Sequence, residues 1–312
     1  MLATHFDNPL IRSIETSPDP YIVKHNDLYY YCLTDVKNKE IWIWRSPTLE
    51  GLDTTHDKQM VWKAPLRGPY SKNVWAPEIH FIDDNWYIYF TADNGENVNH
   101  RLYVLKSQTD NAFGSYDAPI LLQWQNEDYW GIDETIFRNE LDGALYLVWS
   151  GWPGNTDGRQ NLYIAPMDTP VSLSGPRRLL SEPEYGWEGW INEGPSVLQR
   201  NGRIYISYSA HESWGTEYCL GLLYTESYSD LLDPFSWKKQ SFPILKADHQ
   251  VGIYGPGHNS FFKGPENTDW IAYHAKTTTK EGWRDRKACV QQLQWDVTDL
   301  PYVDPMVAWK NV

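Results

Sequence analysis

Apolar and polar residues alternate along this chain in short runs that are separated by turn residues. In the first such stretch, residues 21–23, 28–33 and 40–46 form three runs, and His25-Asn26-Asp27 separates the first two. Alternation with a period of two is typical of half-buried strands, and Asn, Asp and Gly between them favour tight turns. The same order of short strand, turn, aromatic-rich strand, loop and third strand recurs four more times. The pattern predicts an all-β protein of five similar units.

One polar residue stands at the start of the first strand in every unit. These marker residues are Asp19, Glu78, Asp133, Glu193 and His258, at successive spacings of 59, 55, 60 and 65 residues. A period of this length, with several strands in each unit, is the signature of a β-propeller. We therefore predict a single-domain, five-bladed β-propeller. Its blades are expected at approximately residues 17–74, 75–130, 131–190, 191–254 and 255–312.

A short outer strand is expected to complete each blade. The matching segments are residues 59–63, 119–124, 177–181, 242–246 and 306–310. With these strands each blade is built from consecutive sequence, and the ring closes without strand exchange between the chain ends. Three long loops, at residues 93–100, 151–160 and 211–218, interrupt the connection from second to third strand, and loops of this length are often functional. We expect them around the mouth or along the side of a blade.

The marker residues are expected to meet. In a propeller the first strand of each blade lines the central channel, so residues that open these strands converge at one face. Hydrolysis of a glycosidic bond needs one protonated carboxyl and one ionised carboxylate across the sugar, and a third carboxylate can raise the pKa of the acid. Asp19, Asp133 and Glu193 are the candidates for these roles. Singly, each could be a turn or capping residue, but together they favour a shared catalytic function.

Composition narrows the class of ligand. The formal net charge is −14, which argues against nucleic acid or an anionic membrane surface as a partner, and a neutral ligand fits better. Aromatic residues make up 15% of the chain. Strands favour Tyr and Trp, but several tryptophans fall in predicted loops, where they could stack on sugars.

The chain carries no sign of export in its sequence pattern. Its three cysteines, Cys32, Cys219 and Cys289, fall inside predicted strands and are expected to be reduced core thiols. The first residues have neither a basic region nor an apolar core typical of a secretion signal, and no stretch reaches membrane-spanning length. We expect a cytoplasmic protein that does not bind membranes; the sequence does not indicate its oligomeric state.

Five motifs in order resemble those of the family 43 glycoside hydrolases, over essentially the whole chain. They are Ser17-Pro-Asp19-Pro-Tyr21, Trp75-Ala-Pro-Glu78, Ile132-Asp133, Glu193-Gly-Pro-Ser196 and Gly255-Pro-Gly-His258-Asn-Ser260. The resemblance implies a five-bladed propeller with inverting activity on arabinofuranosides or xylosides. It also implies that Asp19 is the general base, Glu193 the general acid and Asp133 the residue that modulates the pKa of the acid.

An inverting mechanism predicts that the carboxyl groups of Asp19 and Glu193 lie about 6.5–9.5 Å apart. One departure from the family pattern stands next to the modulator. Many relatives have Pro after that Asp, whereas this chain has Glu134. The strand therefore carries a second carboxyl whose direction the sequence does not fix.

Further residues are candidates for binding the substrate. Trp75, Trp130 and Trp190 flank the three central motifs and would wall a sugar site, unless they only pack in the core. Glu78 belongs to the same ring of markers. Arg286 would hold Asp19 ionised, or else form an exposed salt bridge.

His258 has two interpretations. It is either a buried, hydrogen-bonded core histidine or, as the resemblance implies, a residue at the axial cavity that contacts the sugar or holds water around a structural Ca²⁺. No cofactor is required for the chemistry.

Several sequence stretches resemble those of the family's exo-acting α-L-arabinofuranosidases, which remove terminal arabinofuranosyl residues from arabino-oligosaccharides. A β-D-xylosidase or an endo-arabinanase is the alternative within the family, so a role in arabinan or xylan degradation is expected. A small oligosaccharide would be the substrate. A non-catalytic carbohydrate-binding propeller is the alternative of another class, and the retention of all three carboxyls argues against it.

Overall fold

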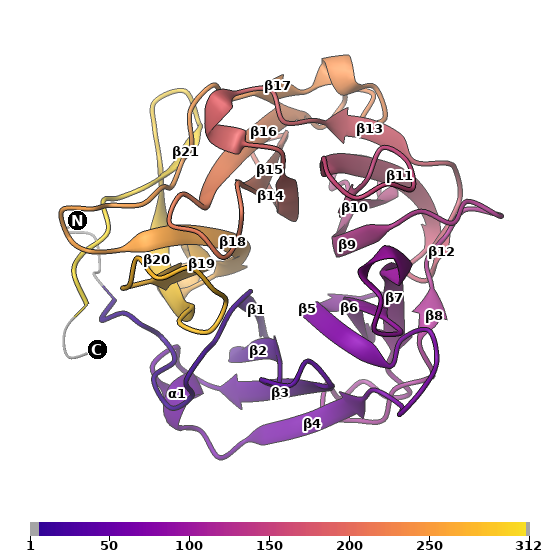
Figure 1. Ribbon diagram of the computed structural model, residues 1–312, viewed down its shortest axis with the longest axis horizontal. Helices are drawn as coiled ribbons and strands as arrows, with labels where there is room; N and C mark the ends of the chain where they lie inside the picture. Colours follow the sequence, from indigo (N-terminus) through magenta and orange to yellow (C-terminus); the bar gives the residue numbers. More distant parts are fainter. Residues whose placement is uncertain (1–5, 310–312) are drawn as a thin grey trace.

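The computed structural model describes residues 6–309, whose strands form five antiparallel sheets arranged around a central axis (Figure 1). In each sheet the first strand in sequence lies nearest the axis, and later strands lie progressively farther out. This architecture confirms the predicted all-β, five-bladed propeller.

The sheets follow one another along the chain. The first contains β1 (Tyr21–His25), β2 (Leu28–Thr34), β3 (Glu40–Ser46) and β4 (Lys58–Lys63), with the short helix α1 (Gly51–Thr54) before the last strand. The second contains β5 (Lys72–Ile82), β6 (Asn85–Asp93), β7 (Arg101–Lys106) and β8 (Ile120–Leu121), with the 3₁₀ turn η1 (Asn97–Asn99). The third contains β9 (Gly131–Arg138), β10 (Leu145–Gly151) and β11 (Asn161–Thr169), whose outer edge pairs with both β12 (Ser172–Leu173) and β13 (Arg178–Ser181).

The last two sheets carry more 3₁₀ turns. The fourth contains β14 (Asn192–Arg200), β15 (Arg203–Ala210), β16 (Cys219–Glu226) and β17 (Lys238–Lys239), with η2 (Gly186–Glu188) before it and η3 (Pro234–Ser236) inside it. The fifth contains β18 (Tyr254–Lys263), β19 (Asp269–Lys276), β20 (Lys287–Trp295) and β21 (Pro301–Val303), with η4 (Pro265–Asn267).

Tight turns set the register of the inner hairpins. His25 pairs with Leu28, so only two residues connect β1 to β2. Two-residue hairpins favour turns in which both residues have positive φ, because that backbone matches the twist of the strands. The turn residues with this conformation are Asn26 and Asp27, Asp83 and Asp84, and Asn201 and Gly202.

The hydrophobic core lies between neighbouring sheets. Ile43 of the first sheet and Phe90 of the second belong to one buried cluster, and Ile164 of the third sheet and Ile206 of the fourth belong to another. Strands alternate their side chains between two faces, so each blade packs against both neighbours. All three cysteines are buried and unpaired, as predicted. Within residues 6–309, no helix is long and apolar enough to span a bilayer.

Two of the predicted outer strands are wrong. The outer strand of the fourth sheet is β17, whereas residues 242–246 contribute only an isolated bridge between Leu245 and Leu220. The outer strand of the fifth sheet is β21, and residues 306–309 form no strand, while Lys310 lies outside the described residues. Pro243 and Pro305 stand in or beside the two segments, and proline cannot donate the hydrogen bond that a strand ladder requires.

The N-terminal segment joins the last blade to the first. Each sheet is built from consecutive sequence, as predicted, but β21 pairs only with the end of β20, from Leu293 to Trp295. Residues 8–17 cover the earlier part of that edge. The backbone N–H of Leu10 donates to the carbonyl of Ala288 (2.7 Å), and that of Ser17 donates to the carbonyl of Arg286 (2.9 Å).

Asn8 completes this contact with its side chain. Its Nδ2 donates to the carbonyl of Val290 (2.9 Å), and its Oδ1 accepts from the Val290 N–H (2.8 Å). One amide side chain thus satisfies both backbone groups of a residue in β20. An unpaired backbone group away from water costs about as much as a lost hydrogen bond.

We therefore expect Asn8→Ala to lower the free energy of unfolding by about 1–3 kcal/mol, because it leaves both groups of Val290 without partners. Urea denaturation followed by tryptophan fluorescence measures this change. The control is Asn126→Ala in an exposed turn, where a change within about 0.5 kcal/mol is expected. Equal effects of the two substitutions would contradict the role of Asn8 in closing the ring.

Candidate active site

A residue with left-handed backbone stands near the start of every innermost strand, within it or shortly before it. These residues are Asp19 (φ 50°), Ala76 (φ 43°), Asp133 (φ 59°), Gly194 (φ 52°) and His258 (φ 47°). In the sheets of β5, β9, β14 and β18 the strand register shifts nearby, as in a β-bulge. Bulges re-aim side chains beside active sites, and a non-glycine residue in this conformation costs about 1–2 kcal/mol. The five strands therefore share one local distortion at the same end of the propeller.

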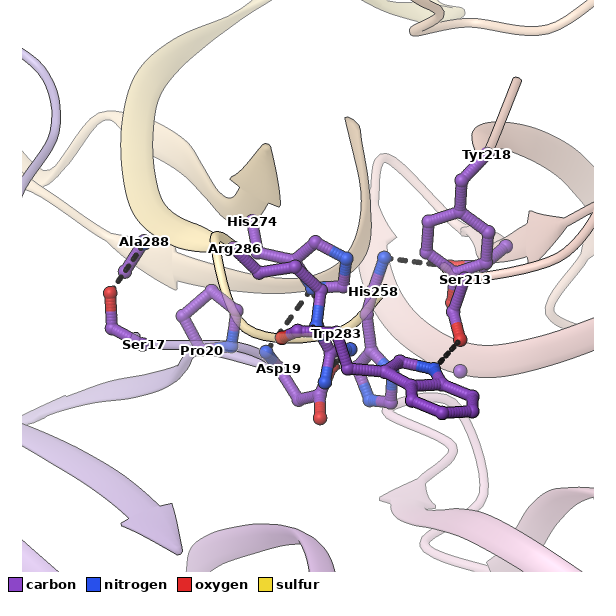
Figure 2. Close-up of polar contacts among 12 residues, drawn as sticks. Ser17, Asp19, Pro20, Ser213, Tyr218, His258, His274, Trp283, Arg286 and Ala288 are labelled. Carbon is purple, nitrogen blue, oxygen red and sulfur yellow. Dashed lines mark hydrogen bonds and ion pairs between the residues drawn. The ribbon is translucent and has the colours of Figure 1, made fainter. Parts of the chain in front are cut away.

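Asp19 is held in an ionised state. Its Oδ1 lies 3.0 Å from Nη1 of Arg286, 3.2 Å from Nδ1 of His274 and 3.4 Å from Nδ1 of His258 (Figure 2). Burial alone would raise the pKa of Asp19, but the Arg286 guanidinium and the two imidazoles outweigh it and hold this pKa well below its ordinary value. Of the two alternatives for Arg286, the structure thus shows the contact with Asp19 and not an exposed salt bridge.

Glu193 has the opposite electrostatic environment. Burial raises the pKa of Glu193 to about 7; the charge of Asp19 adds to the increase, while the hydrogen bond from Tyr218 and the charge of Arg286 oppose it. The Tyr218 hydroxyl donates to Oε1 of Glu193 (2.8 Å), and both side chains are buried. Gly257 makes room for the Tyr218 ring, because a Cβ at this position would overlap it. Glu193 can thus carry a proton in mildly acidic solution.

Asp133 lies next to the acid. Its Oδ2 accepts a hydrogen bond from the backbone N–H of Gly194 (3.1 Å), the residue that follows Glu193. Burial raises the pKa of Asp133, and the charges of Glu193 and Asp19 raise it further. Two buried carboxyls that interact so closely titrate as a pair, which retains a proton where isolated carboxyls would be ionised.

The other two carboxyls near the axis have different partners. Glu78 stands two residues beyond the left-handed Ala76, is buried, and lies 3.0 Å from Nε2 of His80 through its Oε2. Glu134 turns toward the second blade, where its Oε1 accepts from the Tyr103 N–H (3.1 Å). Burial raises the pKa of both groups. The direction of Glu134, which the sequence left open, is thus toward a neighbouring blade.

The three predicted tryptophans differ in exposure. Trp75 is half-buried and stacks on the ring of His100, with centroids 4.1 Å apart. Trp130 is buried, lies parallel to Trp152 at 4.4 Å, and donates from Nε1 to the carbonyl of Asn97 (2.8 Å). Trp190 is 68% exposed. Trp130 thus packs against the 93–100 loop, Trp190 has a solvent-facing ring, and sugar binding by any of the three stays a prediction.

The surroundings of His258 do not fit a calcium ligand set. Ca²⁺ takes six to eight oxygen ligands, whereas His258 faces one carboxylate oxygen of Asp19 that already contacts the Arg286 guanidinium. Among residues 6–309, no group of three or more His, Cys, Asp or Glu side chains is placed to hold a metal ion. The expected structural Ca²⁺ and the metal-binding role of His258 therefore find no support.

Two residues of this network were missing from the sequence prediction. Tyr218 contacts the acid, and its ring stacks on that of His274, with centroids 5.5 Å apart and planes at 7°. His274 in turn contacts Asp19, so a chain of packed side chains joins the two carboxyls. His274 interrupts an otherwise apolar run in β19, which is a visible signal; Tyr218 stands in an irregular loop and offers none.

Comparison with known proteins agrees with this geometry. The model of the family described as glycosyl hydrolases family 43 matches residues 6–301. An extracellular exo-α-(1→5)-L-arabinofuranosidase of Streptomyces chartreusis is 35% identical over 280 residues, which cover 87% of this chain and 82% of the relative. A protein of the same name from Streptomyces avermitilis is also 35% identical, and the match covers 95% of this chain but only 62% of that protein.

The fold comparison gives the same result. The crystal structure of an α-L-arabinofuranosidase from Lactobacillus brevis superimposes with a TM-score of 0.90 at 32% identity, and the match covers 100% of both chains. The match to the family model extends over nearly the whole chain, and it includes Asp19 and the strands that carry Asp133 and Glu193. This chain is a glycoside hydrolase that belongs to glycosyl hydrolase family 43.

Proposed function

We propose that this protein is an exo-acting α-L-arabinofuranosidase that hydrolyses terminal arabinofuranosyl residues of arabino-oligosaccharides with inversion. The observation that carries the proposal is the contrast between the partly buried carboxyl of Asp19 and the buried carboxyl of Glu193 in one network. Asp19 is held ionised by Arg286, while Glu193 is kept protonated up to about neutral pH. Glycoside hydrolysis requires this division between base and acid.

Asp19 acts as the base in this mechanism. Its contacts with Arg286, His274 and His258 are all made to Oδ1, so Oδ2 is the oxygen assigned to the reacting water. Oδ2 accepts a proton as the water oxygen attacks the anomeric carbon. Because Arg286 lowers the pKa of Asp19, the carboxylate remains ionised throughout the working range of pH.

Glu193 acts as the acid. It donates its proton to the glycosidic oxygen as the bond to the anomeric carbon breaks, and the departing sugar leaves as a neutral alcohol. The Tyr218 hydroxyl stabilises the carboxylate that remains. Asp133 is assigned the role of modulator: it positions the acid through the Gly194 N–H, and the two carboxyls titrate as a pair in which the charge of Glu193 raises the pKa of Asp133. Each proton returns to its starting place when the products exchange with solvent.

The substrate class is supported by the names of the relatives. The proteins from both Streptomyces species and from Lactobacillus brevis are named arabinofuranosidases. Weaker matches are named β-xylosidase and endo-1,5-α-L-arabinosidase, at 23–25% identity. Trp75 and Trp190, with Arg286, are assigned to contacts with the bound sugar.

We expect the protein to release 4-nitrophenol from the α-L-arabinofuranoside much faster than from the β-D-xyloside. Asp19→Asn should lower kcat by about 10²–10⁴-fold on every substrate, because it removes the general base.

Glu193→Gln should lower kcat by a similar factor on arabinobiose but much less on the nitrophenyl arabinoside, because 4-nitrophenolate leaves without protonation. Steady-state kinetics measure these factors, and proton NMR of the first-formed sugar should show the β anomer.

The control for these variants is Asp157→Asn, which removes an exposed carboxyl in the 151–160 loop and should leave kcat unchanged. Equal losses for Glu193→Gln on both substrates would refute its role as the acid. A wild-type protein that binds arabinobiose without cleaving it would favour the carbohydrate-binding alternative.

The pH dependence of kcat/KM follows from the different surroundings of Asp19 and Glu193. Protonation of Asp19 abolishes the base, and because its pKa is lowered, the acid limb of kcat/KM should lie well below the ordinary carboxyl range. Deprotonation of Glu193 abolishes the acid, so activity should fall as the pH rises through about 7. Tyr218→Phe removes a donor to the ionised acid and should move this alkaline limb upward by about one pH unit.

Profiles of kcat/KM from pH 3 to 9 on arabinobiose check this shift. Tyr228→Phe, at an exposed position, is the matched control and should leave both limbs in place. An alkaline limb that stays fixed or moves downward in Tyr218→Phe would show that Tyr218 does not stabilise the ionised form of Glu193.

A further inference from the structure

A second group of aromatic side chains stands on the fourth and fifth blades, whereas Trp75 and Trp130 belong to the second and third. Trp214 and Trp283, which we call the tryptophan clasp, meet edge to face with ring centroids 5.4 Å apart. They are 37% and 56% exposed. Trp214 comes from the loop after β15 and Trp283 from the loop after β19, so the clasp joins the fourth and fifth blades.

Both loops stand at the catalytic end of the propeller. Asn192 at the start of β14 pairs with Ala210 at the end of β15, and Tyr254 at the start of β18 pairs with Lys276 at the end of β19. The loops that follow Ala210 and Lys276 therefore emerge where the innermost strands begin. The carboxyl ring lies at that same end.

A buried lysine holds the clasp in place. Lys276 is fully buried, and its Nζ donates to the carbonyls of Trp214 (3.1 Å), Lys280 (2.7 Å) and Gly282 (3.1 Å). It also lies 3.4 Å from the carboxylate of Asp285. A buried ammonium is costly unless it is fully paired. This lysine thus has enough partners to fix the two loops against each other.

Direct hydrogen bonds add to this arrangement. Nε1 of Trp283 donates to the hydroxyl of Ser213 (3.2 Å), as Figure 2 shows, and the Gly282 N–H donates to the carbonyl of Trp214 (3.0 Å). The polar edge of the Trp283 indole is therefore satisfied by protein. Its exposed remainder is apolar ring surface held in one orientation.

The clasp connects to both halves of the catalytic machinery. The carbonyl of Trp283 accepts from Nε of Arg286 (3.2 Å), the residue that holds Asp19 ionised. The loop that carries Trp214 ends at Tyr218, which contacts Glu193. An occupant of the clasp would therefore lie beside the acid and its partners.

We propose that the tryptophan clasp binds the leaving-group sugar, the arabinofuranosyl residue next to the terminal one. This inference rests on the function proposed above. Glu193 protonates the departing oxygen, so the leaving sugar lies on the side of the acid, where the loop of Trp214 runs. The C–H face of a furanose covers apolar indole surface, and its hydroxyls remain in water at the rim.

The test compares two substrates that share the terminal sugar. Arabinotriose places a sugar on the clasp, whereas methyl α-L-arabinofuranoside places only a methyl group there. For Trp283→Ala and Trp214→Ala, we expect kcat/KM on arabinotriose to fall about tenfold or more, as for the loss of one buried aromatic contact. On the methyl glycoside we expect little change. The ratio of the two values is the readout.

Phe235→Ala is the matched control, since Phe235 is an exposed aromatic residue between β16 and β17, at the other end of the fourth blade. It should leave the ratio unchanged. A Trp283→Ala variant that loses the same factor on both substrates would overturn the proposal, because that result indicates displacement of Arg286 rather than loss of a subsite. Melting temperatures show whether each variant is folded, and Trp283→Phe should recover part of the ratio.

Calorimetric binding separates this proposal from the proposed function. If wild-type protein cleaves neither arabinoside, the assigned activity is wrong, and the affinity for arabinotriose then tests the clasp alone. Trp283→Ala should weaken binding of arabinotriose about tenfold or more while that of arabinose stays the same. Equal affinities of wild type and variant for arabinotriose would overturn the clasp as a sugar site.

Discussion

The structure depends on the contact between the N-terminal segment and β20, because this contact both closes the ring and assembles the base. Ser17 donates its N–H to the carbonyl of Arg286, and its hydroxyl accepts from the Ala288 N–H (2.8 Å). Asp19 follows two residues later, which brings its carboxylate to the Arg286 side chain (Figure 2). Residues separated by most of the chain are thus aligned by strand-like hydrogen bonds. The lowered pKa of Asp19 is therefore a consequence of how the two ends of the propeller meet.

A propeller suits acid and base chemistry because its axis is the one place where all five sheets start. The carboxyls that meet there are buried, or partly buried in the case of Asp19, and the loss of water around each of them favours its protonated form. Only Asp19 has a guanidinium within contact distance of its carboxylate; Glu193 has a neutral hydroxyl and Asp133 a backbone N–H in the described structure. The pKa values separate because the cation lies on one side of the ring. Without the charge of Arg286, the carboxyls would have similar pKa values, and none would be set apart as the base or as the acid.

The sequence predicted the features that recur in every blade, but few of the features that belong to a single blade. Alternating apolar residues and turn residues specify strands locally, and their period placed Asp19, Asp133 and Glu193 at one end of the axis. The two failed outer strands contain or adjoin Pro243 and Pro305, whose missing N–H outweighed an apolar pattern. The left-handed backbone at Asp133 and His258 was also beyond prediction, because these residues lie inside strands, where the alternating pattern predicts extended backbone. Tyr218 and His274 matter through contacts with residues far away in the sequence. His274 was visible as a break in the apolar run of β19, but nothing in the sequence showed what it would contact.

The aromatic residues divide into two groups with different physical roles. Trp130 and Trp152 are buried and parallel, and Trp130 fixes the 93–100 loop by donating to the carbonyl of Asn97. Trp214 and Trp283 are held by Lys276 yet remain exposed. A buried pair of tryptophans stabilises the fold. An exposed pair fixed by a buried lysine does not enlarge the hydrophobic core, and the lysine loses its hydration. An exposed apolar surface held in one orientation is typical of a site where a ligand covers it. Because this surface lies on outer loops and the carboxyls lie on or directly before the innermost strands, the choice of substrate can change while the proton chemistry stays constant.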